Sequence, residues 1–355
     1  MRQIGILLLC CISLLSSGAQ TVPNLYRAVD QEKMNHWVDS VFDAMSYDER
    51  IGQLFMVIAN PKSDNRNMQR LMRYVNDIKI GGILFHKGDP VTQAEVTNRL
   101  QKASRIPMLV SLDGEWGLSM RLSGTTRFPK NMMLGAIEDN ALIEEYGKEV
   151  GRQCREMGIH INFAPDMDVN SNVDNPVIGL RSFGENPEAV SEKGIAYARG
   201  LENTGILSVS KHFPGHGDTD VDSHKALPVL PFTRERLDSV ELYPFKEAIR
   251  AGVGGMMVGH LQVPVIEPIG GLPSSLSRNV VYDLLTDELA FKGLIFTDAL
   301  AMRGVSGNGN VSLQALQAGN DMVLAPRNLK AEVPAVLAAV EKGELSREDI
   351  ESKCR

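Results

Sequence analysis

Residues 293–299 read GLIFTDA, a short unbroken apolar run that ends near an aspartate. Seven further runs of this kind occur along the chain: LFMVIA (54–59), GGILFH (81–86), PMLVSLD (107–113), HINFAPD (160–166), ILSVSKHF (206–213), GMMVGHL (255–261) and DMVLAP (321–326). Runs that are continuous rather than alternating are typical of parallel strands buried on both faces. The sequence therefore predicts eight strands of a parallel sheet.

Amphipathic segments that we expect to be helices separate these runs. Examples are 139–157, 186–203, 233–252 and 277–290, and a glycine lies at or just after the end of the first three. Strands alternating with helices predict the α/β class, and eight such units predict a closed (β/α)8 barrel of the TIM type. The competing architecture is an open doubly wound sheet, but no Gly-rich phosphate loop follows the first predicted strand. No linker divides residues 20–355, so we expect one domain.

Polar side chains lie at the ends of five predicted strands. These residues are Asp113, Asp166, the pair Lys211 and His212, His260 and Asp298. The carboxyl ends of the strands of a (β/α)8 barrel share one mouth, where the βα loops build the active site. The sequence thus predicts a polar site at that mouth. For any one of these residues taken alone, a helix cap or a rim contact is an equal expectation.

The first residues of the chain predict export. Residues 1–19 run from a charged start through an apolar stretch (4–15) to small residues, which is the pattern of a cleavable signal peptide. About a dozen apolar residues are too few to span a bilayer as a helix. A retained anchor with lipid on Cys10 or Cys11 is the alternative. Either way, we expect residues 20–355 to be periplasmic or extracellular.

Composition limits the partners. The formal net charge is −7 and there is no basic cluster, which argues against nucleic acid as a partner. No later segment is apolar for long enough to predict a membrane span. Outside the signal peptide only Cys154 and Cys354 remain, which is not a disulfide framework, so stability must come from a core. The sequence does not predict an oligomeric state, and a monomer is one of the possibilities.

The stretch KHFPGHGDTDVDSH (211–224) concentrates three histidines, three aspartates and a lysine. Its aspartates alternate as in an EF-hand calcium loop. That loop needs glycine at its sixth position and glutamate at its twelfth, where this chain has Ser223 and Val229. The sequence therefore argues against calcium.

Two readings of this stretch stay open. Zinc could be bound by His212, His216 and His224, although the proline and glycines between them forbid the helix that brings histidines four apart together. Alternatively, Asp222 and His224 form a dyad, because residues two apart in an extended loop project to the same side. The carboxylate would then hold one ring nitrogen and leave the other free for general acid/base catalysis. A solvated loop pair is the simpler alternative to the dyad.

Asp298 is the candidate that faces this dyad. It follows a predicted strand and precedes a turn, so its carboxylate should stand in the mouth, where carboxylates act as nucleophiles, bases or metal ligands. An acid/base group opposite a nucleophilic carboxylate is the arrangement of a retaining glycosidase. The usual pair is two carboxyls, so a histidine in the acid role is a departure.

The stretch 211–224 closely resembles the signature of the β-N-acetylglucosaminidase branch of glycoside hydrolase family 3. Further matching stretches are SLDGEWG (111–117), NFAPDMDVNSNVDNPVIGLRSFG (162–184) and GLIFTDALAM (293–302), and the resemblance extends from about Val41 to the end of the chain. It implies a single (β/α)8 barrel that removes terminal β-linked N-acetylglucosamine, typically from peptidoglycan fragments. The resemblance further implies retention of configuration and no cofactor.

Carried over residue by residue, the resemblance makes Asp298 the nucleophile and His224 the general acid/base, oriented by Asp222. It places sugar binding on Asp113, Arg121, Arg181, Lys211 and His212. Carboxylates accept hydrogen bonds from sugar hydroxyls, and the cationic side chains donate to them. For each arginine a structural salt bridge at the rim is the alternative. For His216 and Asp218, scaffolding of the loop is favoured over substrate contact.

The chain departs from the family in two places. DGEWG (113–117) stands where family members commonly have Asp-Gln-Glu-Gly-Gly, and Trp116 is expected either to stack on a sugar or to pack. The second place is SREDIESKCR (346–355), which begins as a helix capped by Ser346 and stops after barely two turns. Because family members usually continue there, we expect a fragment of a longer protein.

Three other functions compete with this reading. A β-glucosidase of the same family commonly draws its acid/base carboxylate from a second domain, whereas here a loop of the barrel offers the acid. A non-catalytic glycan-binding protein has no need of a nucleophile facing a dyad. The third alternative, a metal-dependent barrel hydrolase, depends on the zinc reading.

Overall fold

The computed structural model describes residues 22–60, 65–305 and 309–355. The expected signal peptide, with Cys10 and Cys11, lies outside the described residues. The eight strands are β1 (Phe55–Ala59), β2 (Gly82–Phe85), β3 (Leu109–Leu112), β4 (Ile161–Asn162), β5 (Leu207–Phe213), β6 (Gly255–Val258), β7 (Leu294–Thr297) and β8 (Val323–Leu324).

All of the strand pairs are parallel, in the order β7-β6-β5-β4-β3-β2-β1-β8. A further parallel bridge between Phe296 and Met322 joins β7 to β8, so the sheet closes on itself. The predicted (β/α)8 barrel is therefore confirmed, as a single domain. Each of the eight apolar runs contains one strand, but β4 is much shorter than the run 160–166 that predicted it.

Apolar side chains fill the inside of the barrel. Met56, Ile161, Phe163, Val209 and Phe296, from four strands or their ends, belong to one buried cluster. The rings of Phe163 and Phe296 meet edge to face across it, with centroids 5.4 Å apart. The barrel is thus a packed core rather than a pore, and a binding site can form only at its ends.

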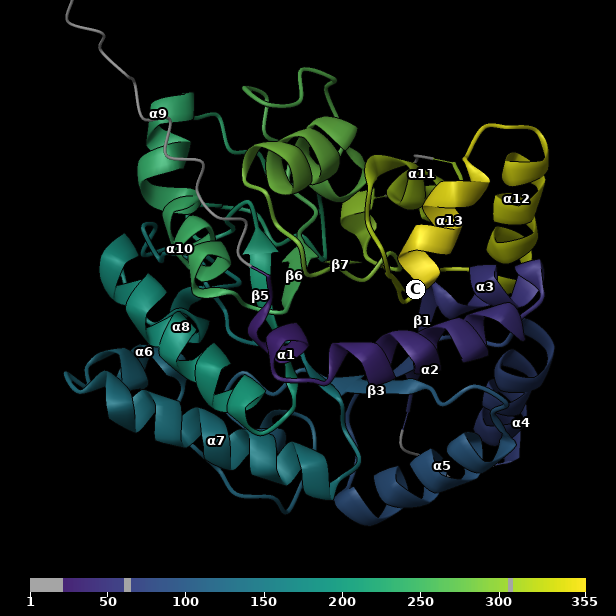
Figure 1. Cartoon of the computed structure of the whole chain (residues 1–355). Coiled ribbons are helices and arrows are strands. Elements are labelled where there is room, and N and C mark those ends of the chain that lie inside the picture. The colour runs from purple at the N-terminus through teal and green to yellow at the C-terminus, as the bar shows by residue number, and fades with distance from the viewer. Residues whose placement is uncertain (1–21, 61–64, 306–308) are drawn as a thin grey trace, which may run out of the picture.

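Helices surround the strands (Figure 1). Those between successive strands are α4 (Asn65–Arg73), α5 (Pro90–Ala103), α6 (Asn131–Gly135), α7 (Asn140–Glu156), α8 (Pro187–Asn203), α9 (Arg234–Arg236), α10 (Tyr243–Ala251) and α11 (Val311–Ala318), and α12 (Leu329–Glu341) follows β8. Three π-helical segments are η1 (Tyr74–Ile78), η4 (Leu237–Glu241) and η6 (Asn279–Glu288). Short 3₁₀ turns are η2 (Leu118–Met120), η3 (Gly179–Arg181), η5 (Ser274–Leu276) and η7 (Arg303–Val305).

The single helix predicted over 233–252 is broken in the structure. It divides into α9, η4 and α10, and Pro244 stands in the first turn of α10, where proline supplies no backbone N–H to a preceding turn. By contrast, α8 begins as its sequence predicts, with Asn186 accepting from the N–H of Ala189 and Pro187 in the first turn.

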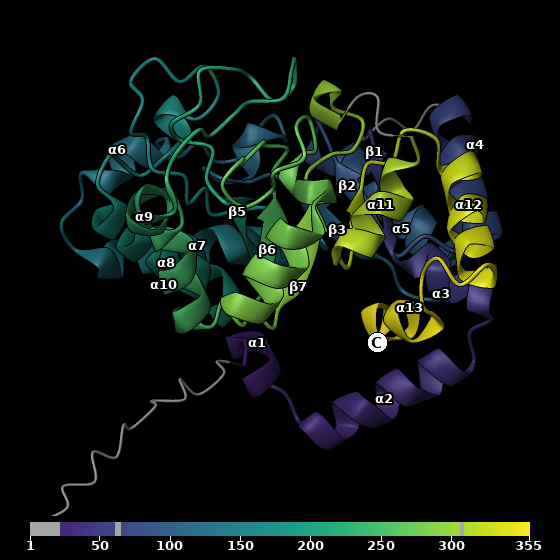
Figure 2. The ribbon, with the colours of Figure 1, turned by 90° about the horizontal axis from the view of Figure 1, so that it is seen from above.

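The amino-terminal face of the barrel is covered by α1 (Asn24–Arg27), α2 (Gln31–Asp43), α3 (Tyr47–Gln53) and α13 (Arg347–Cys354). Figure 2 shows α1, α2 and α13 on one side of the barrel, opposite the long loops that follow β4 and β5. Arg50 of α3 pairs with Glu351 of α13 at 2.7 Å. As predicted, Ser346 caps α13, accepting from the N–H of Asp349. The opposite face, at the carboxyl ends of the strands, is left to the loops.

No helix in the three described ranges combines the length and the apolar character that a membrane span requires. Of the two cysteines in the described residues, Cys154 is buried in α7, Cys354 is half-buried at the end of α13, and both are free.

Candidate active site

The strand-end residues predicted from the sequence meet at the carboxyl face of the barrel. Lys211, in β5, extends its ammonium group to two carboxylates: Nζ lies 2.8 Å from Asp113 Oδ1 and 2.8 Å from Glu115 Oε1. Arg121 donates to the other oxygen of Asp113, with 2.6 Å between Nη2 and Oδ2. Burial alone would raise the pKa of Asp113, but these two cations outweigh it and hold the pKa below its usual range.

Glu115 belongs to the same cluster, although it was not among the predicted site residues. Arg181 donates two parallel hydrogen bonds to it, 2.9 Å from Nε and 2.8 Å from Nη2. Burial raises the pKa of this fully buried carboxyl, but Arg181 and Lys211 together lower it to about 2. The signal in the sequence was its place in the same turn, two residues after Asp113.

Both predicted arginines therefore take part in salt bridges, as their alternative reading expected. Their side chains also keep 18% (Arg121) and 19% (Arg181) of their surface exposed. Each guanidinium is thus held by a carboxylate, while part of its side chain stays exposed.

Asp168 orients His212 and was likewise missed. Its Oδ2 lies 2.7 Å from His212 Nδ1, and its carboxylate also accepts the backbone N–H groups of His212 and His216. Because a carboxylate only accepts, the ring proton sits on Nδ1, which leaves Nε2 to accept from Arg181 Nη2 at 3.2 Å. A buried carboxylate therefore fixes the tautomer of the predicted sugar-binding histidine.

Asp166 is fully buried beside Asp168 and Arg181. Its Oδ1 accepts the N–H of Asp168 at 3.1 Å, whereas its Oδ2 accepts no hydrogen bond in the described part of the chain. Burial, and then the nearby Asp168 charge, raise the pKa of Asp166 well above its usual range. One of two neighbouring aspartates thus favours its protonated form.

Asp166, Asp168 and His212 also bring possible metal-ligating atoms within 4.8 Å of one another. Arg181 Nη2 lies among them, 3.6 Å from Asp166 Oδ2 and 3.2 Å from His212 Nε2. The guanidinium already supplies the positive charge that these donors face, and a second cation there would be repelled.

The turn that carries Asp113 and Glu115 is held from behind. Asn162 of β4 accepts the N–H of Gly114 at 2.8 Å and donates to its carbonyl at 3.2 Å. Tyr197 of α8 donates to the same carbonyl at 2.8 Å. The neighbouring Trp116 is half-buried, with the ammonium of Lys130 5.3 Å from its ring centre.

Asp222 and His224 form the predicted pair in the loop after β5. Asp222 Oδ1 lies 2.9 Å from His224 Nδ1 and 2.9 Å from the backbone nitrogen of the same residue. The His224 side chain is 64% exposed, so its other ring nitrogen is open to the mouth and to solvent. This is the geometry expected of a histidine whose carboxylate partner holds one tautomer.

In the middle of the loop, His216 and Asp218 contact other protein side chains, as expected of residues that hold the loop in place. His216 is buried, with Nδ1 2.7 Å from Thr219 Oγ1 and Nε2 3.0 Å from Ser223 Oγ, and burial lowers its pKa to about 4. Asp218 pairs with Arg236 at 2.8 Å. The ring nitrogens of the three histidines therefore contact different residues and do not converge as a shared zinc ion would require.

Asp298 follows β7 at the mouth, half-buried, and its Oδ1 accepts the N–H of Ala299 at 2.7 Å. Burial would raise the pKa of this carboxyl. Neighbouring histidines, His260 and His212 first and His224 to a smaller extent, together with the Ala299 N–H, lower the pKa instead. Asp298 therefore favours its ionised form.

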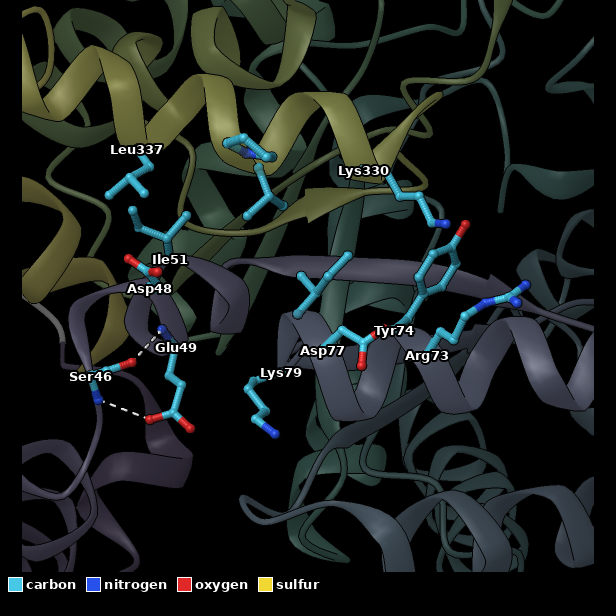
Figure 3. Close-up of a pocket in the computed structure, with 13 residues that line it drawn as sticks. Ser46, Asp48, Glu49, Ile51, Arg73, Tyr74, Asp77, Lys79, Lys330 and Leu337 are labelled. Carbon is cyan, nitrogen blue, oxygen red and sulfur yellow. Dashed lines mark hydrogen bonds between the residues drawn. The ribbon is translucent and has the colours of Figure 1, made fainter.

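A cavity of about 760 Å³ lies elsewhere, on the outer wall of the barrel between α3, η1 and α12 (Figure 3). Tyr74, Lys330 and Leu337 are among its lining residues, and none of the strand-end residues reaches it. This cavity is separate from the candidate active site.

The sequence profile of the glycosyl hydrolase family 3 N-terminal domain matches residues 46–355. Among curated proteins, beta-hexosaminidase A of Pseudoalteromonas piscicida is 35% identical over 282 residues, which are 72% of this chain and 47% of that protein. The beta-N-acetylglucosaminidase/beta-glucosidase of Cellulomonas fimi is 28% identical over 326 residues, 89% of this chain and 57% of that protein.

Among solved structures, a glycoside hydrolase family 3 beta-N-acetylglucosaminidase from Paenibacillus sp. FPU-7 superimposes with a TM-score of 0.82 at 39% identity. The match covers 87% of this chain and 61% of that one. The chain thus spans about half to three-fifths of the length of these three relatives.

Proposed function

The chain belongs to glycosyl hydrolase family 3, and on that premise we propose that it is a retaining β-N-acetylhexosaminidase acting on terminal β-linked N-acetylglucosamine. One observation carries the proposal: the turn that follows Asp298 is hydrogen-bonded to the loop that bears Asp222 and His224, with 3.2 Å between the nitrogen of Gly304 and the carbonyl oxygen of Ser223. A nucleophile and an acid/base group at one barrel mouth are the two parts that this reaction needs.

In the proposed first step, an oxygen of Asp298 attacks the anomeric carbon as His224 gives its Nε2 proton to the glycosidic oxygen. The bond to the leaving group breaks with its electron pair, and a glycosyl ester forms on Asp298. In the second step His224 takes a proton from water, the water oxygen attacks the same carbon, and Asp298 leaves as a carboxylate. Asp222, hydrogen-bonded to Nδ1, stabilises the imidazolium that donates in the first step and forms again in the second.

Sugar binding is assigned to Asp113, Arg121, Arg181, Lys211 and His212. The ion pairs among them support this role, because side chains already held by partners lose little rotational freedom when a sugar binds. Asp113 accepts from hydroxyl groups, whereas the cations donate to them.

We propose terminal residues of peptidoglycan fragments as the natural substrate, met after export to the periplasm or the cell surface. Product analysis on peptidoglycan fragments beside chitobiose tests the substrate. Fractionation of cells that express the full chain tests the compartment. Protein confined to the cytoplasm would contradict export.

The runner-up function is a β-glucosidase, and the name of the Cellulomonas fimi relative carries both activities. Rates on aryl N-acetyl-β-glucosaminide and aryl β-glucoside separate the two. We expect a clear preference for the N-acetylated sugar, and preference for the glucoside would overturn the substrate assignment. Dialysis against EDTA should leave the rate unchanged, whereas a loss restored by zinc would favour a metal-dependent hydrolase.

Substitution Asp298→Asn tests the nucleophile. Loss of the attacking oxygen should lower kcat by about 10³-fold or more, with an unchanged thermal transition. On wild-type protein, a 2-fluoro sugar with a good leaving group should label Asp298, as mass spectrometry of its peptides would reveal. Turnover by the variant at the wild-type rate, or no labelling of a catalytically active wild type, would reject the role.

A further inference from the structure

His260 is a fully buried histidine just beyond β6 that the proposed chemistry does not use. Its Nδ1 lies 2.7 Å from Ser275 Oγ, and its Nε2 lies 3.1 Å from the carbonyl oxygen of Ala299. A carbonyl can only accept, so Nε2 carries the proton and Nδ1 accepts from the serine hydroxyl. Burial lowers the pKa of His260, and the nearby Asp298 carboxylate acts in the opposite direction.

Ala299 directly follows Asp298, and its N–H binds the Asp298 carboxylate at 2.7 Å. The peptide groups on either side of Ala299 are thus tied to different partners: its N–H to Asp298 and its carbonyl to His260. Arg327, beyond β8, holds the next part of the turn by donating to the carbonyls of Leu300 and Met302 at 3.0 and 2.9 Å. The turn after β7 is therefore fixed by side chains from its two neighbouring strand ends.

The far end of this turn meets the loop that bears Asp222 and His224. The N–H of Gly304 donates to the carbonyl oxygen of Ser223 at 3.2 Å. A Cβ on Gly304 would lie 2.9 Å from that oxygen and 3.2 Å from His260 Cβ. Only a residue without a side chain lets the two segments approach this closely.

We propose that His260 and Gly304 are positioning residues that align the acid/base loop with the nucleophile. His260 sets the Ala299 end of the turn, next to Asp298, and Gly304 seats Ser223, next to His224. The inference rests on the proposed function of Asp298 and His224. It adds that the distance between Asp298 and His224 is set by residues 299–304, which contact Asp298 at one end and Ser223, next to His224, at the other.

The two positions should differ in how their substitutions depend on the leaving group. Dinitrophenolate leaves without protonation, whereas a sugar alcohol leaves only with a proton from the acid. Displacing the Ser223 segment alone therefore harms the poor leaving group. Displacing the nucleophile harms both substrates.

The first test is Gly304→Ala, assayed as kcat/KM on dinitrophenyl N-acetyl-β-glucosaminide and on chitobiose. We expect about a tenfold or larger loss on chitobiose and less than about a twofold loss on the dinitrophenyl glycoside. The matched control is Gly255→Ala at the start of β6, where a Cβ would lie 2.8 Å from the Ser208 carbonyl oxygen. It creates a similar clash far from the mouth and should change both rates by one common factor.

The second test compares His260→Leu with His260→Gln. Leucine removes the hydrogen bond to Ala299 and should lower kcat/KM on both substrates by about 10- to 100-fold. Glutamine can place an N–H near the same carbonyl and should restore most of that loss. If Gly304→Ala does not fold, as judged by circular dichroism, this pair decides the question.

Equal losses on both substrates in Gly304→Ala would overturn the inference for that residue. His260→Leu within twofold of wild type, or no rescue by glutamine, would overturn it for His260. A wild-type protein that hydrolyses neither substrate would instead reject the proposed function, so the two failures are distinguishable.

Discussion

Two carboxyl groups, those of Glu115 and Asp166, share Arg181 as a neighbour, yet their pKa values shift in opposite directions. Glu115 receives three contacts from two cations, and its pKa falls to about 2. Asp166 has Arg181 only at 3.6 Å and lies beside the negative Asp168, so its pKa rises. Both are fully buried, which means that the pairing of charges, and not the depth, decides the protonation of each.

Glu115→Gln should destabilise the protein in a pH-dependent way. The folded-state pKa is lowered, so the ionised carboxyl contributes stability above its ordinary value near 4.5 and loses it as the pH falls toward 2. With two buried cations left short of a partner, we expect a loss of about 3 kcal/mol at pH 7. Urea unfolding at pH 7 and pH 3 measures it. A difference of the same size at both pH values would contradict the assignment.

Asp166→Asn should have the opposite effect on stability, because it should stabilise the protein at high pH. A carboxyl whose pKa is raised by folding costs stability once the pH exceeds its unfolded value of about 3.8, and the cost grows until the folded pKa is reached. An amide of the same shape removes this cost. We expect calorimetry to give the variant a Tm at or above that of wild type at pH 8, with no such gain at pH 3. A variant less stable at pH 8 than at pH 3, relative to wild type, would show that the ionised form is the native one.

At the scale of elements, the apolar runs predicted the strands because a parallel strand that is buried on both faces is a continuous apolar run in the sequence. The ends of these runs also predicted Asp113, Lys211, His212 and Asp298 at one mouth, since parallel strands end together. Glu115 and Asp168 were missed, because each lies two residues beyond a predicted aspartate, in turns whose direction depends on partners elsewhere in the chain. The break at Pro244 was missed because a proline in a first helical turn is compatible with both one helix and two.

Tyr197→Phe tests how far the turn 113–117 depends on α8. The variant loses the hydrogen bond to the Gly114 carbonyl but keeps the ring, which stacks on Tyr146 with centroids 5.0 Å apart. We expect a loss of about 1 kcal/mol in stability and a KM raised about threefold with kcat nearly unchanged, because the turn orients Asp113, to which we assign sugar binding. Steady-state kinetics and denaturant unfolding provide both numbers.

The matched control is Tyr146→Phe, whose hydroxyl lies 3.5 Å from the Glu115 carbonyl. Its longer contact should matter less for KM. Equal changes of KM in both variants would mean that the ring stack, and not the hydrogen bond to Gly114, holds the turn.

On the scale of the whole molecule, the barrel separates its two faces. The amino-terminal face is covered by helices from both ends of the described chain, joined by the ion pairs of Arg50 with Glu351 and of Arg355 with Asp39. The carboxyl face carries the candidate active site. Stability and catalysis should therefore respond to different sets of substitutions.

Ile350→Ala probes this separation. The side chain is fully buried between α13 and the body of the barrel, so its truncation should cost about 3 kcal/mol of unfolding free energy. Because the mouth is at the other face, we expect kcat/KM at 25 °C to stay within about twofold of wild type. A large fall in kcat/KM of the folded variant would reveal coupling across the barrel.

The gathering of α1, α2 and α13 at one face also bears on how the molecule can be attached to something else. A linker joined to one of these three helices leaves the barrel on the side away from the loops that follow β4 and β5. A bead, an electrode or a fused protein held in this way would leave the mouth turned toward the medium. Enzyme immobilised through this face should accept long glycan chains about as readily as free enzyme, whereas attachment through lysines near the mouth should exclude them.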